Sequence, residues 1–323
     1  MRINPKYIPL LATAIVLVAI FGTGALLYPN FGTPRVVVNL FYDMAFTGVA
    51  AVGETFVILS GGIDLSVGSM VAFVGILIAR LLQAGLDPFL CMAVALIIGT
   101  IAGGVMGCLI YFFELPPFLV TLAGLFFLRG VGFAIYPESI GIDHPFYAQV
   151  LPQLSVAVAP KAVLQFPAIC FLASVLVGTF VAGFTRFGRY VYAIGSNENS
   201  ARLMGLPIGR TKIMTYALSG FFAAFGGVVM TFYMQSGNPA SFVGLELDAI
   251  ASVVIGGTLL TGGVGFVPGT LMGVLILGII QQIIIFNGTL NSWWTKIVIG
   301  ALLLVFIVLQ KLISRRGMQT AAA

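Results

Sequence analysis

Long apolar stretches separated by short polar ones dominate this chain of 323 residues. A helix needs about 20 apolar residues to cross the hydrocarbon core of a bilayer. The stretch at residues 248–261, the eighth along the chain, is shorter than this. If it and the second stretch, at residues 38–59, enter the membrane only part-way, the chain has eight spans. Otherwise the pattern predicts a polytopic, all-α membrane protein with ten spans, at residues 8–27, 38–59, 65–83, 89–112, 118–136, 166–184, 213–234, 248–261, 267–286 and 293–312.

The composition leaves no room for a water-facing domain. Hydrophobic residues make up 60% of the chain and charged residues 8%, and the mean hydropathy is +1.12. A soluble domain carries about 25% charged residues. We therefore expect residues 1–323 to form a single transmembrane domain. Glycines at Gly99–Gly103–Gly107 and at Gly269–Gly273 predict close helix contacts, because small residues let helix backbones approach in lipid.

The basic residues predict the orientation, because cytoplasmic loops carry an excess of lysine and arginine. With the N-terminus inside, both termini are cytoplasmic, and Arg129 is left over within the fifth segment. The net charge of +5 then reflects topology, and no nucleic-acid partner is expected. The inner set is Arg2, Lys6, Arg186, Arg189, Arg202, Arg210, Lys212, Lys311, Arg315 and Arg316, and the outer set is Arg35, Arg80, Lys161 and Lys296.

Two polar loops interrupt the apolar pattern. Residues 137–165 form the longest outer loop. This loop is either a lid or a contact surface for an external partner, or it is a simple connection. Residues 186–212 form a basic cytoplasmic loop, in which Asn199–Met204 carries helix formers between a capping Ser196 or Asn197 and a terminating glycine. This pattern predicts a short amphipathic helix that docks a partner, and the alternative is a loop that contacts lipid headgroups. The residues predicted to dock the partner are Ser196, Asn197, Glu198, Ala201, Arg202, Met204, Gly205 and Leu206.

An eight-residue pattern, G-G-x-x-L-[ST]-x-G, occurs twice, at residues 61–68 and 256–263. Each copy follows an apolar run and is predicted at the inner edge of the membrane. Transporters are often built from internal repeats, although chance in a glycine-rich chain also accounts for a match this short. Asp64 is predicted to cap the third helix near Val67. The motif residues at these two places are Gly61, Gly62, Asp64, Ser66, Gly68, Glu246, Asp248, Gly256 and Gly257.

Charges inside membrane segments are costly and usually face a cavity or a partner. Asp43, Glu54 and Arg129 are such charges. One interpretation is that these charges line a polar path through the bundle. The alternative is that Arg129 pairs with Glu54 or Asp43, which would neutralise buried charge.

Several kinds of chemistry are missing. None of the five lysines follows a glycine, so the Gly-Lys-[Ser/Thr] signature of a phosphate-binding loop is absent. No G-x-G-x-x-G or G-x-S-x-G motif occurs, and the single histidine, His144, has no second metal ligand at a suitable spacing. We therefore predict no catalytic residue, no cofactor and no metal site.

Four stretches bring a resemblance to a known family. The chain resembles the permease subunits of bacterial ABC importers of the ribose/galactose class, and within that class it is most similar to the permeases of the galactofuranose importer. The class resemblance is carried by GETFVILSGGIDLSVGS (53–69), LPPFLVTLAGLFFLRG (115–130), GRYVYAIGSNENSARLMGLPIGRTK (188–212) and ELDAIASVVIGGTLLTGGVG (246–265). The finer resemblance is carried by ESIGIDHPFY (138–147), FFLRG (126–130) and NSWWTKIVIG (291–300).

This resemblance implies a type II ABC importer-like bundle of about ten helices in the bacterial inner membrane. It implies a second permease chain (a homodimer or heterodimer), a periplasmic sugar-binding protein, and a separate cytoplasmic ATPase that contacts residues 196–206. One departure is Val264, where many relatives carry a basic residue.

The predicted function is passage of a monosaccharide, and the alternatives are an ion-coupled secondary transporter and a membrane-embedded enzyme. Because a sugar is neutral, the path needs hydrogen-bonding groups. The predicted path residues are Asn39, Thr47, Glu54, Thr55, Gln235 and Asn238.

Overall fold

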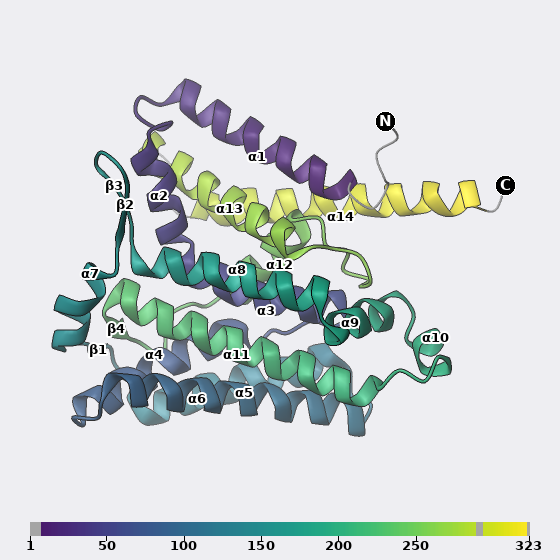
Figure 1. Cartoon of the computed structure of the whole chain (residues 1–323), viewed down its shortest axis with the longest axis horizontal. Coiled ribbons are helices and arrows are strands. Elements are labelled where there is room, and N and C mark those ends of the chain that lie inside the picture. The colour runs from purple at the N-terminus through teal and green to yellow at the C-terminus, as the bar shows by residue number, and fades with distance from the viewer. Residues whose placement is uncertain (1–7, 289–292, 322–323) are drawn as a thin grey trace.

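The computed structural model describes residues 8–288 and 293–321 (Figure 1). Of the predicted cytoplasmic bases, Arg2 and Lys6 lie outside the described residues, as do the side chains of Lys311, Arg315 and Arg316. Each of the ten predicted segments contains a helix, which confirms the all-α class. The helices are α1 (Ile8–Leu27), α2 (Pro34–Asp43), α3 (Ala45–Leu59), α4 (Val67–Gln83), α5 (Pro88–Phe112), α6 (Pro117–Ile135), α7 (Leu151–Gln153), α8 (Phe166–Phe184), α9 (Arg186–Ser196), α10 (Glu198–Leu203), α11 (Ile208–Met234), α12 (Leu245–Ile255), α13 (Val267–Asn287) and α14 (Trp293–Ala321), with a π-helical turn, η2 (Phe146–Val150).

Fewer helices than ten have the length of a full span. Among the described residues, six helices are long and apolar enough to cross a membrane, and a seventh span results if α2 and α3 are counted as one. The axes of α2 and α3 differ by 58° across the break at Met44. Three predicted spans fall outside this count: α4 has 17 residues, α12 has 11, and α14 has 29, of which Trp293–Val308 is the apolar part.

The periplasmic loop predicted at residues 137–165 is partly structured. It holds η2, α7 and a hairpin made of β2 (Val156–Ala159) and β3 (Ala162–Leu164). Its first strand, β1 (Ile140–Gly141), pairs antiparallel with β4 (Ser236–Gly237), directly after α11. The loop is therefore tied to the end of α11.

Helix α11 runs through the middle of the bundle and packs against α3, α4 and α5. A Cβ atom added to Gly103 would lie 2.2 Å from the carbonyl oxygen of Tyr216, and one added to Gly107 would lie 2.8 Å from the Cα of Ile213. The predicted contact through the glycines of α5 is thus confirmed, and its partner is α11. In α13, a Cβ on Gly273 would lie 1.9 Å from the Ser252 carbonyl oxygen of α12, which confirms the second glycine contact.

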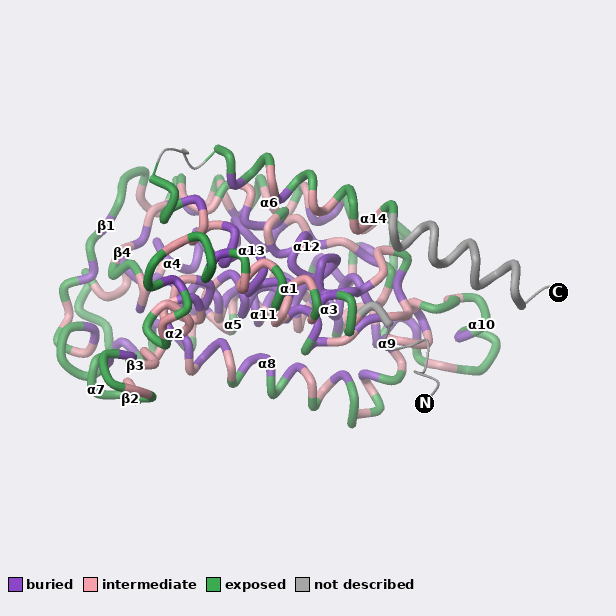
Figure 2. The backbone as a smooth tube through the Cα atoms, turned by 90° about the horizontal axis from the view of Figure 1, so that it is seen from above, coloured by how far each residue is buried: buried purple, intermediate pink, exposed green. Residues whose placement is uncertain are grey.

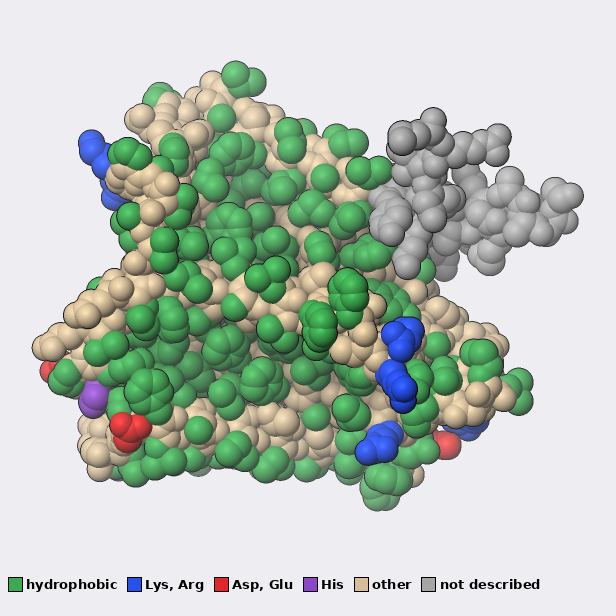
Figure 3. Space-filling model, viewed as in Figure 1, with side chains coloured by type: hydrophobic (Ala, Val, Ile, Leu, Met, Phe, Trp, Pro, Cys, Tyr) green, Lys and Arg blue, Asp and Glu red, His purple; other side chains and the backbone are tan. Residues whose placement is uncertain are grey.

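Buried residues gather in the middle of the bundle, and exposed residues follow its outer helices and both ends (Figure 2). Many outward side chains are apolar: Phe126 and Phe127 of α6 are 68% and 70% exposed, and Leu176 of α8 is 71% exposed. Hydrophobic side chains cover much of the face in Figure 3, and lysine and arginine gather at the end that carries α9 and α10. A surface of this kind suits lipid contact in the middle and water at the ends.

Candidate functional site

The predicted amphipathic helix in the basic loop is present as α10. The Oδ1 atom of Asn197 accepts a hydrogen bond of 2.8 Å from the Ser200 amide, so Asn197 is the cap. The helix ends after Leu203, and Gly205 has a φ of 75°, which favours glycine. The caps predicted from sequence therefore set both ends of the helix.

The inner side of α10 is held against its neighbours. Ala201 is fully buried in a small apolar cluster with Ile194 of α9 and Ile208 of α11. Glu198 accepts from Lys212 at 2.7 Å and from Arg202 at 3.3 Å. Exposed ion pairs each contribute about 0–1 kcal/mol, so the burial of Ala201 does more to hold the helix in place.

The outer side of α10 exposes apolar side chains. Leu203 is 91% exposed and Met204 is 67% exposed. Successive helical residues are about 100° apart, so burial of Ala201 turns Leu203 to the opposite side of the helix. The two side chains form an adjacent apolar pair at an end of the bundle where lysine and arginine gather. Met204 was among the predicted docking residues and Leu203 was not, although the helix period places Leu203 opposite the buried Ala201.

A polar cavity of about 630 Å³ separates α10 from the turn between α5 and α6. Glu114 and the prolines of that turn form one wall, and Asn199, Arg202 and Lys212 form the other.

The two copies of the repeated glycine pattern lie against each other, beside the end of α9. The amide of Gly263 donates to the carbonyl of Leu59 at 2.9 Å. A Cβ on Gly195 of α9 would lie 1.8 Å from that carbonyl oxygen and 2.6 Å from the Gly263 nitrogen. The Tyr192 hydroxyl of α9 donates to the Gly265 carbonyl at 2.8 Å. Burial raises the pKa of Tyr192, which keeps its hydroxyl protonated and able to donate.

The remaining motif residues hold this region together. Gly61 and Gly257 have φ values of 83° and 92°, in the region that favours glycine. A Cβ on Gly256 would lie 2.4 Å from the Gly269 carbonyl oxygen, so the loop after α12 packs on α13. Asp248 forms an ion pair of 2.7 Å with Lys296 of α14.

Further motif contacts lie around the start of α4. A Cβ on Gly68 would lie 2.2 Å from Oε2 of Glu246, so only a glycine leaves room there for that carboxylate. Gly62 lies next to the Tyr216 hydroxyl, which a Cβ on Gly62 would approach to 2.3 Å.

The prediction that Asp64 caps α4 is wrong. The N-cap of α4 is Ser66, and no side chain makes the capping hydrogen bond. Instead Oδ1 of Asp64 accepts from the amide and the hydroxyl of Ser66, and Oδ2 accepts from the Ser219 hydroxyl of α11 at 2.8 Å. The Asp64 amide donates to Oε1 of Glu54 at 3.2 Å. Asp64 therefore ties its own loop to α3 and α11.

The suggested pairing of Arg129 with Glu54 or Asp43 is also wrong. Arg129 donates to the carbonyl oxygens of Pro239 and Ser241, at 2.6 and 2.5 Å. The Arg129 guanidinium therefore holds the backbone of the segment between β4 and α12.

The predicted path residues do not gather in one place. Glu54 and Thr55 are fully buried, and Thr55 shares a 2.7 Å hydrogen bond with Thr270. Asn39 is half-buried on α2, Asn238 accepts from the Ala240 amide, and Gln235 lines a cavity beside η2 and the β2–β3 hairpin. Only Thr47 lines a second cavity, of about 370 Å³ and with both polar and apolar lining residues, at the break between α2 and α3.

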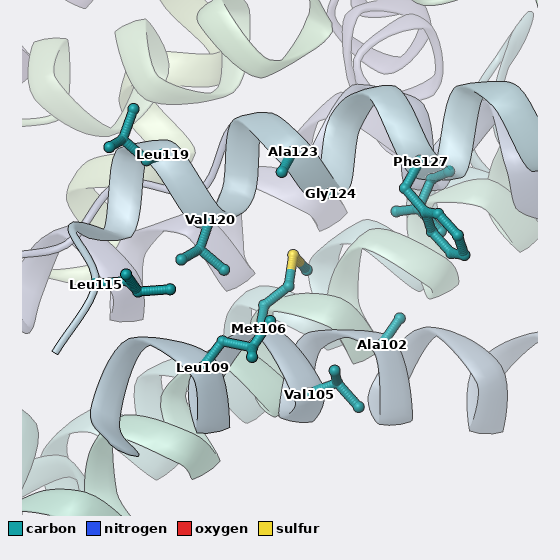
Figure 4. Close-up of a pocket in the computed structure, with 11 residues that line it drawn as sticks. Ala102, Val105, Met106, Leu109, Leu115, Leu119, Val120, Ala123, Gly124 and Phe127 are labelled. Atoms are coloured by element: carbon teal, nitrogen blue, oxygen red, sulfur yellow. The ribbon is translucent and has the colours of Figure 1, made fainter. Parts of the chain in front are cut away.

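An apolar groove of about 480 Å³ lies between α5 and α6 (Figure 4). Met106 and Val105 of α5 face Val120 and Phe127 of α6 across it, and all the lining residues are apolar. A sugar would find no side-chain hydrogen-bonding partner there, so this groove does not suit a sugar path. Within residues 8–288 and 293–321, no group of three or more histidine, cysteine, aspartate or glutamate residues is arranged to hold a metal ion.

The chain matches a protein-family model over residues 36–307, and that family is described as the branched-chain amino acid transport system / permease component. The chain belongs to this permease family. The match covers every helix from α3 to α13, including α10 and both glycine loops. It agrees with a multi-pass membrane protein that forms a passage and carries out no covalent chemistry.

Curated relatives of this permease are similar over most of their length. The inner membrane ABC transporter permease protein YjfF of Escherichia coli K12 is 51% identical over 285 residues, which is 88% of this chain and 86% of the relative. The fructose import permease protein FruG of Bifidobacterium longum is 36% identical over 98% of this chain and 94% of its own. The ribose import permease protein RbsC of E. coli K12 is 34% identical over 92% of this chain and 91% of its own. No solved structure matches the chain.

Proposed function

We propose that this permease is the transmembrane subunit of an ATP-binding cassette importer that moves a monosaccharide, galactofuranose, across the bacterial inner membrane. The observation that carries the proposal is α10, a capped helix that exposes Leu203 and Met204 at a basic end of an otherwise apolar bundle. The chain has no phosphate-binding motif of its own. A docking helix on a chain without an ATPase motif supports an external ATPase as the source of energy.

The import of a sugar is supported by the relatives, two of which are named for fructose and ribose import. The choice of galactofuranose rests on residues 126–130, 138–147 and 291–300, which carry the finer resemblance.

The proposed assembly has partners at both ends of the bundle. The ATPase binds the cytoplasmic loop at residues 186–212, and a periplasmic sugar-binding protein docks at the end that holds the loop at residues 137–165. Both chain termini are cytoplasmic. A second permease chain, identical or different, completes the path, and membrane lipid surrounds the outer helices.

Two measurements test the proposal. The tagged chain is solubilised in detergent, and an ABC ATPase is expected to co-purify with it. A strain that lacks the chain is expected to lose uptake of tritiated D-galactose supplied at low concentration, and D-ribose and D-fructose serve as comparison sugars. Recovery of the chain without any ATPase would overturn the importer assignment. Uptake that survives removal of the ATPase but collapses with the proton gradient would identify an ion-coupled secondary transporter.

A further inference from the structure

The cavity lined by Thr47 and Asp43 lies where several helices are interrupted. Helix α2 ends at Asp43 and α3 begins at Ala45 with a bend of 58°, while α12 begins nearby at Leu245. The last turns of α13 contribute Gln281 and Gln282. Interrupted helices in transporters often mark the place where the substrate binds.

The groups in this cavity match the hydroxyls of a sugar. Asp43 is held in place, because Gln282 donates to its Oδ2 at 2.8 Å and the Tyr233 hydroxyl donates to its Oδ1 at 3.3 Å. Gln281 makes no side-chain hydrogen bond to any residue in the described part of the chain. A fixed carboxylate that accepts and a free amide that donates and accepts can together bind adjacent hydroxyls.

Aromatic rings form another part of the wall. Tyr233, Phe46 and Phe242 line the cavity. The Tyr233 ring lies 5.7 Å from that of Phe46, and the Phe46 ring lies 5.3 Å from that of Phe242. Rings of this kind offer an apolar surface to the C–H face of a sugar while the polar groups set its orientation.

The charge of the cavity disfavours an anion. Asp43 and Asp248 both line it, and the nearby cation, Lys296, is engaged with Asp248 at 2.7 Å. A phosphorylated sugar would meet this negative field, whereas a neutral sugar would not. The volume of about 370 Å³ lies near the lower end of the range for small-molecule sites, about 300–1,000 Å³.

We propose that this cavity is a sugar-contacting site for a neutral monosaccharide, in which Asp43 and Gln281 bind the hydroxyls and Tyr233 contributes the aromatic wall. This inference rests on the proposed function, because it places the imported sugar at one site on the path.

The test uses the complete importer in proteoliposomes, with the binding protein outside and ATP inside. Gln281→Cys is made in a chain whose native cysteines are replaced by serine, and its labelling by a membrane-impermeant thiol reagent is timed. Saturating D-galactose with the binding protein is expected to slow this labelling at least threefold. The matched control is Gln83→Cys, an exposed residue at the end of α4 outside the cavity, whose labelling rate should stay the same.

A second variant covers the case in which Gln281→Cys does not fold. Asp43→Asn is expected to lower D-galactose uptake at least fivefold in an importer that still assembles, as judged by co-purification of the ATPase. An equal labelling rate of Gln281→Cys with and without D-galactose would overturn the site. Normal D-galactose uptake by the Asp43→Asn variant would overturn it as well. Failure of the unmodified importer to take up any sugar would instead overturn the proposed function.

Discussion

The amide of Gly263 donates a 2.9 Å hydrogen bond to the carbonyl of Leu59, and this bond joins the loop that follows α12 to the end of α3. Gly195 of α9 lies against both partners, with no room for a Cβ atom. The helix that leads into α10 is thus in backbone contact with both glycine loops. We infer that a displacement of α10 by the ATPase reaches α3 and α12 together through this junction.

Removing one hydroxyl tests the junction with little disturbance of the fold. Tyr192→Phe deletes the 2.8 Å hydrogen bond from α9 to the Gly265 carbonyl. We expect sugar uptake per ATP hydrolysed to fall three- to tenfold in proteoliposomes, with the complex still assembled, because α9 then moves partly without the second loop. The matched control is Tyr190→Phe, because the Tyr190 hydroxyl has no hydrogen bond to a described residue. An unchanged ratio of sugar to ATP would show that the Tyr192 bond does not transmit the motion.

The exposed tip of α10 gives a second prediction. The double variant Leu203→Ser, Met204→Ser should reduce ATPase co-purification at least tenfold, since both side chains are largely exposed in the free chain and available to a partner. Its melting temperature in detergent should barely change, because surface substitutions usually alter stability by about 0.5 kcal/mol or less. Asn199→Ala, an exposed neighbour in the same helix, is the control. Normal recovery of the ATPase with the double variant would place the docking surface elsewhere.

Local signals in the sequence were enough to predict the helices and α10. Apolar runs of span length gave every long helix, and Asn197 and Gly205 gave the ends of α10, because caps depend only on neighbouring residues. The glycine spacing in α5 predicted a helix contact for the same reason, although its partner, α11, could not be deduced from α5 alone.

Long-range contacts explain what the sequence could not predict. The break at Met44 contains neither proline nor glycine, so nothing local marks the 58° bend that lowers the number of full spans. Arg129 and Asp64 bind groups more than 100 positions away, at Pro239 and Ser219. Charge alone suggested carboxylate partners for Arg129, but backbone carbonyls satisfy the same donors.

The contact between α5 and α11 yields a prediction on stability. Gly103→Val would force side-chain atoms into the Tyr216 carbonyl, because even a Cβ would lie 2.2 Å from its oxygen. Overpacking of this kind costs typically about 1–3 kcal/mol and sometimes more, so the melting temperature in detergent should fall clearly. Gly104→Ala is a control one residue away, where a Cβ would sit 3.8 Å from Ala217, an ordinary contact. Equal stability of the two variants would contradict this packing.

Arg129 supports a prediction on local order. Arg129→Gln removes the guanidinium that holds the carbonyls of Pro239 and Ser241. We expect amide hydrogen exchange in residues 238–244 to speed up at least fivefold, while exchange in α11 stays the same. Arg80→Gln is the control, because the exposed Arg80 side chain donates to the nearby Gln83 and has no hydrogen bond to residues 238–244. Unchanged exchange in residues 238–244 would mean that β4 and α12 hold this segment without Arg129.

Asp64 distinguishes hydrogen bonding from charge at the junction of α3, α4 and α11. Its carboxylate accepts from Ser66 and Ser219 while buried. Asp64→Asn keeps one acceptor for Ser66 and places an amide group beside the Ser219 hydroxyl, which can reverse its role and accept. Asp64→Ala leaves buried hydroxyls without a partner, at about 1–3 kcal/mol each. We therefore expect Asp64→Asn to keep most sugar uptake and thermal stability, and Asp64→Ala to lose both. If Asp64→Asn is as damaging as Asp64→Ala, the negative charge itself is required, and the hydrogen-bond account of this junction is wrong.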